Sequence, residues 1–208
     1  MPDTDDAETK TRTDRNQLIA AVLLGLAATL TAVAAYSAAL ADGEALEGYT
    51  NSTRTLNDAN AFFAQGQHIH GVDQSQFLEY ADAVYADDAA RADYLTTLMR
   101  PELKDAVEWW QETDEAVTPF DELEGNPYAI EDFGVAHELE DEAAVQFDQG
   151  VDADEQGDVF ELAVVFFALA LFFGGIATVF DRQVVVTALF GIAAGVLVFG
   201  SVIYVLAL

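Results

Sequence analysis

Three long uncharged stretches stand out in the pattern of hydrophobic and polar positions along the chain. Residues 18–41 and 162–180 contain no Asp, Glu, Lys or Arg, and a third such stretch runs from 184 to 208 after three interrupting residues. A helix needs about 20 mainly apolar residues to cross roughly 30 Å of hydrocarbon. We therefore predict three transmembrane helices, of which the last two form a tight hairpin.

The first stretch is open to a second interpretation. Lys10, Arg12 and Arg15 precede it and Ala39-Leu40-Ala41 ends it, an order that is typical of a cleavable signal peptide. However, its 24 uncharged residues exceed the apolar core of about 7–15 residues found in such peptides. We expect the stretch to be retained as a membrane anchor.

The basic residues predict an orientation in the membrane. Segments rich in Lys and Arg beside a span stay on the cytoplasmic side. Basic residues gather before the first span and at Arg182, whereas the longer region 42–158 holds only four. We therefore expect a multi-pass protein of the cell (plasma) membrane with a cytoplasmic N-terminus. The predicted segments are a cytoplasmic tail at 1–16, transmembrane helices at 17–41, 159–180 and 184–206, an acidic extracytoplasmic helical domain at 42–158, and a cytoplasmic turn at 181–183.

The region between the first two spans has apolar residues at helical spacing and little alternation of the strand type. The predicted fold class is therefore all-α. We expect the first helix to continue to about Gln67, with Gly48 as a weak point, and to break within the segment 66–71. The tetrapeptide Asp73-Gln74-Ser75-Gln76 has the spacing of a capping box and predicts that a new helix begins there.

Later in this region, Pro101 predicts a helix boundary. Proline is tolerated in the first turn of a helix but disfavours helical geometry in the residue before it. We therefore expect one helix over about 88–100 and another that begins at Pro101, with Glu102 in its first turn. A last acidic amphipathic helix is expected at about 134–150. The residues predicted on one side of the Pro101 helix are Leu103, Ala106 or Val107, and Trp110.

The chain is strongly acidic, with 37 acidic and 8 basic residues and a net charge of −29. At 52% hydrophobic residues it is too apolar to belong to the class of disordered acidic chains. Carboxylates repel one another less at roughly 1 M salt, where the Debye length falls to about 3 Å, so a halophilic origin is predicted. The chain has no basic stripe for nucleic acid, and its lack of cysteine excludes disulfides and thiolate chemistry.

A basic and aromatic segment is the first candidate site. Arg91, Arg100 and Lys104 could bind an anionic ligand, but we expect them to pair with nearby acids, as Lys104 would with the residue four positions later, Glu108. Trp109 and Trp110 cannot both point inward on one helix. One is expected to pack, and the other to cover a neighbouring helix, the membrane interface or a partner protein.

The histidines are weak candidates for a metal site. His68, His70 and His137, with Glu138 beside the last, carry the side chains best suited to Zn²⁺. There is no HExxH motif and no second closely spaced pair, so we expect no metal. The chain also lacks a Ser-His-Asp order, a P-loop and a dinucleotide fingerprint, so we expect neither an enzyme nor a cofactor.

Three further features lie in or near the spans. Asn51-Ser52-Thr53 is a sequon for N-glycosylation. Glu161 would suggest ion transport if it lay deep in lipid, but at the start of its span it can reach interfacial water. Small residues, including Gly25, Gly191 and Gly195, recur at a spacing of four and allow close helix packing. That packing would lie either within one chain or between copies in a homo-oligomer.

Four segments, in order, carry a resemblance to a family of small prokaryotic three-pass membrane proteins. They are AYSAALADG, FLEYADAVYADDAARADYLTTLMRPELKDAVEWW, NPYAIEDF and GDVFELAVVFFALALFFGGIATVF. The resemblance implies an N-terminal span, a helical extracytoplasmic region with an Arg-Pro-Glu…Ala…Trp segment and a C-terminal hairpin, and it implies no activity. The chain departs from the pattern in its His-Ile-His segment and in its heavier acidity, which suggests a halophilic archaeal-type member.

These features favour a non-enzymatic scaffold or interaction component of the cell envelope. The expected partners are the lipid bilayer and either a second copy of the chain or another membrane protein. A sensory or ligand-binding membrane domain without its own output domain is the alternative. A small channel or transporter subunit is disfavoured, because the spans are almost free of polar groups.

Overall fold

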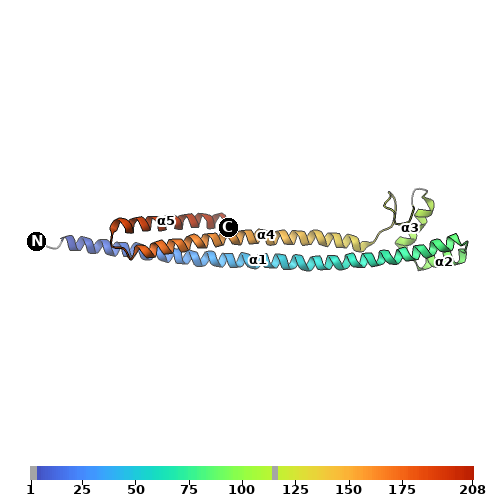
Figure 1. Cartoon of the computed structure of the whole chain (residues 1–208), viewed down its shortest axis with the longest axis horizontal. Helices are drawn as coiled ribbons and strands as arrows, with labels where there is room; N and C mark the ends of the chain where they lie inside the picture. Colours follow the sequence, from blue (N-terminus) through green and yellow to red (C-terminus); the bar gives the residue numbers. More distant parts are fainter. Residues whose placement is uncertain (1–3, 114–116) are drawn as a thin grey trace. The chain divides into compact units, whose positions relative to one another are not determined.

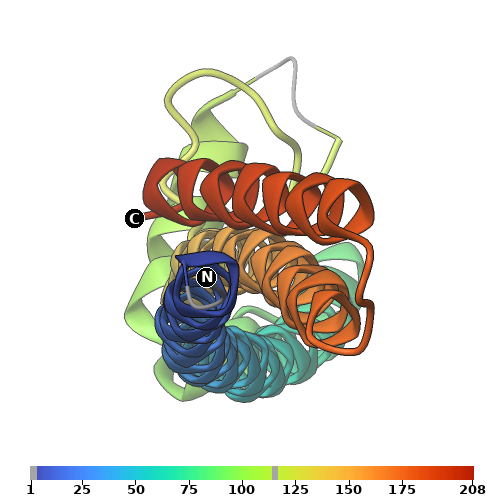
Figure 2. The same ribbon diagram turned by 90° about the vertical axis from the view of Figure 1, so that its left-hand side faces the viewer.

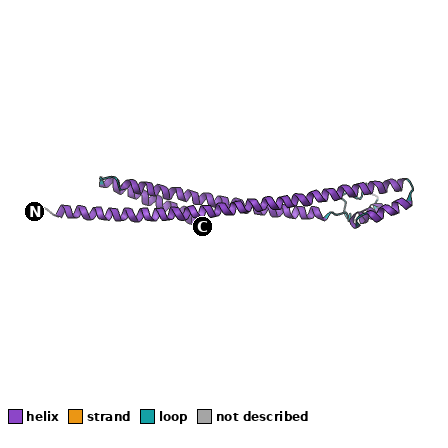
Figure 3. Cartoon of the chain, turned by 90° about the horizontal axis from the view of Figure 1, so that it is seen from below, coloured by secondary structure: helices purple, strands orange, loops and turns teal. Residues whose placement is uncertain are grey.

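The computed structural model describes residues 4–113 and 117–208, with side chains described from residue 17 onward. Five helices occur in these ranges: α1 (Thr4–Tyr85), α2 (Ala89–Leu98), α3 (Pro101–Glu112), α4 (Glu131–Ala177) and α5 (Gln183–Leu206) (Figure 1). The described residues contain no strand (Figure 3), so the predicted all-α class is confirmed. Among them α1, α4 and α5 are long and apolar enough to cross a membrane. The side chains of Lys10, Arg12 and Arg15 in the predicted tail lie outside the described residues.

The chain divides into two compact units. Unit 1 comprises the chain up to Thr50 together with Gln146–Leu208, and unit 2 comprises Asn51–Val145. Helices α1 and α4 therefore contribute to both units, α5 belongs to unit 1, and α2 and α3 belong to unit 2.

In unit 1, α1 and α4 pack closely through small residues. Ala20, Ala27, Ala34 and Ala41 are buried at every seventh position of α1. Their contacts with α4 run in opposite order along the two helices: Leu24 lies beside Gly174, Ala34 beside Ala163, and Ala41 beside Gly157. The pair is therefore antiparallel. A seven-residue repeat keeps one side of a helix facing its partner, and small side chains let the two backbones approach.

The closest approach in unit 1 joins Gly48 to Gly150. A Cβ atom built on Gly48 would lie 2.7 Å from the Cα of Gly150, and one built on Gly150 would lie 2.9 Å from the ring of Tyr49. Neither position can hold a larger residue without moving the helices apart. Gly48 is thus a packing position within a continuous helix.

Helix α5 packs against both partners in unit 1, and Figure 2 shows it lying along α4. Gly200 lies against Phe166 and Phe167 of α4, and Tyr204 forms a 3.0 Å hydrogen bond with Ser37 of α1. The Gln156 amide donates to the Ala207 carbonyl at 2.7 Å, which satisfies one of the carbonyls left open at the end of α5. The connection before α5 covers 178–182 and so begins earlier than the predicted turn at 181–183. The apolar residues at 178–180 gave no sequence signal that α4 ends at Ala177. The end is marked by the backbone amides of 178 and 179, which donate to the carbonyls of 175 and 176.

In unit 2, the predicted boundaries of α2 and α3 are confirmed. The carboxylate of Asp88 accepts the backbone N–H of Arg91 and caps α2, and Pro101 is the first residue of α3. The two helices cover the last turns of α1. The buried core of unit 2 consists of Phe77, Tyr80, Ala83, Ala92, Leu95, Met99, Leu103 and Val107.

Two predicted helix ends do not occur, one in unit 2 and one in unit 1. Helix α1 continues through 66–71. A Cβ atom built on Gly66 would lie 2.7 Å from the ring of Phe133, so this glycine leaves space for the ring and does not end the helix. Asp73 is therefore inside α1, and the predicted capping box there is wrong. Helix α4 likewise begins at Glu131 and continues without a break to Ala177, past the expected end near 150.

Candidate functional site

The most unusual polar residue of unit 2 is Asp73, which is only 2% exposed. It occupies the side of α1 on which Ser52, Ala59 and Gly66 are buried at seven-residue intervals. The small members of this series allow close packing, whereas Asp73 places a carboxylate in the interior. A buried charge is costly unless it is paired and hydrogen-bonded.

Arg100 and Tyr128 supply the partners of Asp73. The Arg100 Nε donates to Asp73 Oδ2 at 2.7 Å, and the Tyr128 hydroxyl donates to the same oxygen at 2.9 Å. The other nitrogens of Arg100 donate to Glu102 at 2.9 Å and to the Ala129 carbonyl at 2.8 Å. The guanidinium also lies 5.2 Å from the centre of the Tyr128 ring. One arginine thus connects α1, the start of α3 and the segment before α4.

His70 extends the network by one further step. The only hydroxyl hydrogen of Tyr128 goes to Asp73, so in the 3.0 Å bond between His70 Nδ1 and the Tyr128 oxygen the histidine must donate. Its Nε2 then accepts from the amide of Gln74 at 2.9 Å. With the Gln74 amide in this orientation, the hydrogen of His70 that faces Tyr128 lies on Nδ1.

A compact loop positions Tyr128. Asp121 accepts the backbone amides of Val117 and Thr118 at 2.6 and 3.2 Å and the Thr118 hydroxyl at 2.7 Å. Asn126 donates to the carbonyls of Pro119 and Asp121, and its own side-chain oxygen accepts the Tyr128 amide at 2.9 Å. These hydrogen bonds lower the pKa of Asp121. The bond from the Thr118 hydroxyl has the largest effect, and the bonds from the two backbone amides come next.

The network changes the acidity of its members. Burial, and next the hydrogen bond to Asp73, raise the pKa of Tyr128 to about 12. For Arg100, burial opposes the charge, but the hydrogen bonds to Asp73 and Tyr128 and their Coulomb attraction together outweigh it, so its pKa is raised. Tyr128 therefore remains a neutral donor and Arg100 a cation over the ordinary pH range. This arrangement fixes three segments of unit 2 and leaves the Asp73 carboxylate enclosed.

Of the predicted basic site residues, only Arg100 joins this network. Arg91 is exposed on α2, and Lys104 is exposed on α3. The predicted pair of Lys104 with Glu108 is not among the ion pairs in the part of the chain that the structure describes. Of the three, Arg100 alone bonds to the Asp73 carboxylate in the part of the chain that the structure describes.

The two tryptophans divide their roles. The ring of Trp110 meets Phe77 edge-on at 5.1 Å between centroids and joins the core of unit 2. Trp109 is half-buried and lies beside Gly125, whose φ of +87° suits glycine at that point of the loop. The second tryptophan thus covers the loop, a neighbour that the sequence did not indicate.

The three histidines are not brought together. His68 and His70 are two residues apart on a continuous helix, where their directions differ by about 200°, and only His70 enters the network. His137 is exposed on α4, with Glu140 at 3.8 Å and Asp141 at 4.0 Å. Residues 17–113 and 117–208 contain no group of three side chains placed to hold a metal ion.

The remaining sequence candidates lie on α1 and α5. Asn51 is half-buried within α1, and the next residue of its sequon, Ser52, is buried. Gly25, Gly191 and Gly195 have open space where a Cβ would be, so they are not contact points between the helices of one chain. A contact of these glycines between copies stays a prediction.

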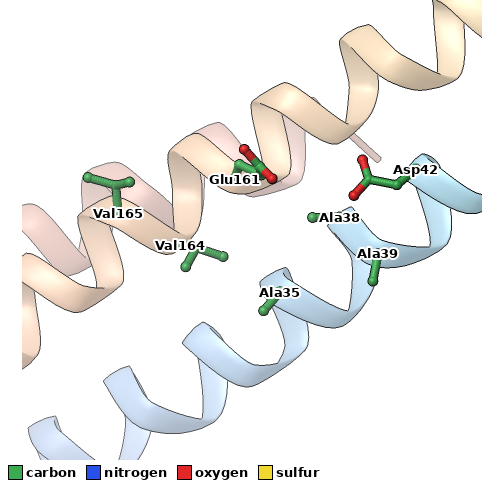
Figure 4. Close-up of a pocket in the computed structure, with 7 residues that line it drawn as sticks. All are labelled: Ala35, Ala38, Ala39, Asp42, Glu161, Val164 and Val165. Carbon is green, nitrogen blue, oxygen red and sulfur yellow. The ribbon is translucent and has the colours of Figure 1, made fainter. Parts of the chain in front are cut away.

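A cavity in unit 1 carries two carboxylates at the ends of the uncharged stretches. It measures about 330 Å³ and lies between α1 and α4 (Figure 4). Asp42 and Glu161 border it from the two helices, and alanine and valine side chains form the rest of its lining. Both carboxylates are exposed, so each can meet water at the predicted membrane boundary.

Sequence reasoning missed the roles of Asp73 and Tyr128. The seven-residue phase that runs through Ala59 and Gly66 could have shown that Asp73 is buried, but no local signal indicates Tyr128, which comes from 55 residues away. Comparisons with protein-family models, curated proteins and solved structures find no match. The fold itself defines an all-helical protein with three helices of membrane-spanning length and hydropathy.

Proposed function

We propose that the chain is an integral protein of the cell membrane that acts as a non-enzymatic scaffold or interaction component of the envelope. In this proposal the three apolar stretches of unit 1 are the anchor, and residues 42–158 face outward. The observation that carries it is the pairing of the buried Asp73 carboxylate. Its two partners, Arg100 just before α3 and Tyr128 in the 117–130 segment, join separate parts of unit 2 and stiffen it. The polar contacts of Asp73 therefore serve the fold.

The continuity of α1 supports the same role. It passes from the uncharged stretch at 18–41 into unit 2 without a break. The uncharged stretch and part of unit 2 thus share one helix, which suits a membrane protein that presents its outer region to a partner.

The interaction role is tested by isolating the full chain from its host membrane in mild detergent and molar salt. We expect a particle larger than the 22.4 kDa monomer after subtraction of detergent, as measured by light scattering coupled to size-exclusion chromatography. A monomer from which native-membrane cross-linking recovers no partner would contradict the proposal.

The orientation is tested separately, because the chain has no cysteine of its own. Thr97→Cys on exposed α2 should react with a membrane-impermeant maleimide in intact cells. Arg182→Cys in the turn before α5 should react only in inverted vesicles. The reverse pattern would overturn the outward placement of unit 2.

A further inference from the structure

One face of α1 in unit 2 is exposed and free of charge. Its residues alternate at spacings of three and four, and all of them are exposed. Leu78 is 66% exposed, and a Cβ on Gly71 would meet open space. We call these residues the charge-free face: Asn57, Asn60, Ala64, Gln67, Gly71, Gln74 and Leu78.

The opposite side of the same helix follows the same repeat. Ser52, Ala59, Gly66, Asp73 and Tyr80 are buried at intervals of seven. A seven-residue repeat on a helix keeps one set of positions facing a partner, as in a coiled coil. On the buried side the partners are the rest of unit 2, including Phe133 beside Gly66. The charge-free face has the spacing of a second such contact.

The charge distribution indicates which partner fits. Between residues 51 and 78, α1 carries Arg54, Asp58 and Asp73, and the last of these is paired with Arg100. By contrast, residues 131–145 of α4 carry no lysine or arginine. Their acids are Glu131, Asp132, Glu138, Glu140, Asp141 and Glu142.

A chain with a net charge of −29 meets like charge when a copy approaches most of its surfaces. Interface cores are depleted of charged residues, because charges must lose their water there. Screening at roughly 1 M salt weakens the repulsion between carboxylates but does not remove that desolvation cost. Two copies can approach closely where α1 meets α1 without burying carboxylates. A cationic partner would instead choose the acidic side of α4.

We propose that the charge-free face binds the same face of a second copy in a parallel pair of α1 helices. This inference rests on the proposed function and names its partner. Two copies anchored in one membrane with the same orientation are related by a two-fold axis along the membrane normal, so identical residues meet. Asn57 and Asn60 would face their counterparts, where amides can exchange hydrogen bonds and fix the register.

The same phase continues along α1 within unit 1. Gly25, Ala32, Ala39 and Leu46 precede Asn60 by multiples of seven, and all four are exposed. Small residues at such positions let helices approach in lipid. Unit 1 therefore carries, on its own part of α1, residues that suit a contact between copies.

Disulfide formation between single cysteines tests the proposal in the full chain, in native membranes and at molar salt. Asn60→Cys and Ala64→Cys place a thiol on the charge-free face, and Glu138→Cys and Asp141→Cys are matched exposed controls on α4. We expect the first pair to form disulfide dimers at least about tenfold faster, since only a two-fold contact brings identical residues together. Equal rates in all four variants, or faster dimerisation through α4, would overturn the proposal.

Charge substitution provides an independent test that does not depend on thiol geometry. Asn60→Glu and Asn60→Lys should each raise the dimer dissociation constant about tenfold by placing like charges opposite one another. Expressed together with different tags, the two variants should associate as a mixed pair. Membrane insertion of each variant, checked by carbonate extraction, shows that the loss is one of association.

The outcomes also separate this inference from the proposed function. A particle larger than a monomer that forms no dimers through Asn60 or Ala64 means that the partner is another protein, so the inference fails and the scaffold role stands. A monomer without any partner contradicts both.

Discussion

The Nε of Arg100 donates to the buried Oδ2 of Asp73 at 2.7 Å, and this bond links the residue before α3 to the interior side of α1. Arg100 has an extended backbone because Pro101 follows it, and that conformation also ends the previous helix. The bond therefore depends on the same proline that divides α2 from α3. The backbone restriction imposed by Pro101 and the pairing of the buried Asp73 charge therefore both depend on the position of Arg100.

Removing Arg100 should destabilise unit 2 strongly. In Arg100→Leu the Asp73 carboxylate would lose its charged partner while it stays buried, which costs about 3 kcal/mol or more. We expect a lower denaturant midpoint for protease resistance of unit 2 in lipid or detergent. Arg91→Leu is the matched control, because Arg91 is exposed and should change stability by about 0.5 kcal/mol at most.

A double variant distinguishes a buried charge from lost packing. Asp73→Leu with Arg100→Leu removes both charges, and replacing a buried ion pair by apolar residues is often neutral. We expect it to recover much of the stability that Arg100→Leu loses. A double variant as unstable as the single one would show that the pair itself is not the cause.

Gly48 and Gly43 offer a matched test of the helix contact in unit 1. Gly48→Ala should destabilise the pairing of α1 with α4 by about 1–3 kcal/mol, because the added methyl meets the Gly150 backbone. Gly43→Ala adds the same methyl into open space and should be neutral or stabilising by up to about 1 kcal/mol through helix propensity. Thermal unfolding in detergent measures both, and similar shifts would contradict the contact.

The glycines also explain where sequence reasoning failed. Glycine disfavours a helix in isolation, so the segment 66–71 suggested a break. In the structure Gly66 accommodates the Phe133 ring, and packing outweighs the propensity cost. By contrast, the starts of α2 and α3 were predictable. The capping carboxylate of Asp88 acts within the first turn of α2, and Pro101 acts within the first turn of α3. The three apolar stretches were predictable for a similar reason, since their composition alone marks them, although α1 and α4 continue far beyond these stretches.

The candidate site was less accessible to sequence reasoning. Arg100 was recognised as a partner for acids, but its partner could have been any of many carboxylates. The actual bonds join Asp73, Arg100 and Tyr128 across 55 residues of sequence, and only the fold brings them together.

Tyr128 predicts a loss of stability at alkaline pH. Its pKa is raised from 10.0 to about 12 in the folded chain, so between these values the unfolded state releases a proton that the folded state keeps. Stability from this group is complete below about pH 10 and is lost as the pH rises towards 12. Protease resistance of unit 2 measured from pH 9 upward should fall more steeply in the natural chain than in Tyr128→Phe. Identical slopes would show that Tyr128 does not contribute.

Low salt should loosen unit 2 and leave unit 1 helical. Residues 131–145 carry six carboxylates and no lysine or arginine. The repulsion between these carboxylates acts over a longer range near 0.1 M salt, where the Debye length is about 10 Å. Unit 1 is held by apolar and small residues, on which salt has less effect. Trp109 and Trp110 are the only tryptophans and both belong to unit 2, so their fluorescence reports on this unit alone.

We expect the tryptophan emission to shift to the red below about 0.1 M salt, as Trp110 loses its contact with Phe77, while far-ultraviolet circular dichroism keeps the signal of the long helices. A variant with Glu138, Glu140 and Asp141 changed to the corresponding amides should need less salt for the same emission. These three residues are exposed, so the change removes repulsion without disturbing the core. Emission that does not move with salt in either chain would mean that the carboxylates of α4 do not oppose folding, and the halophilic interpretation of the acidity would lose its physical basis.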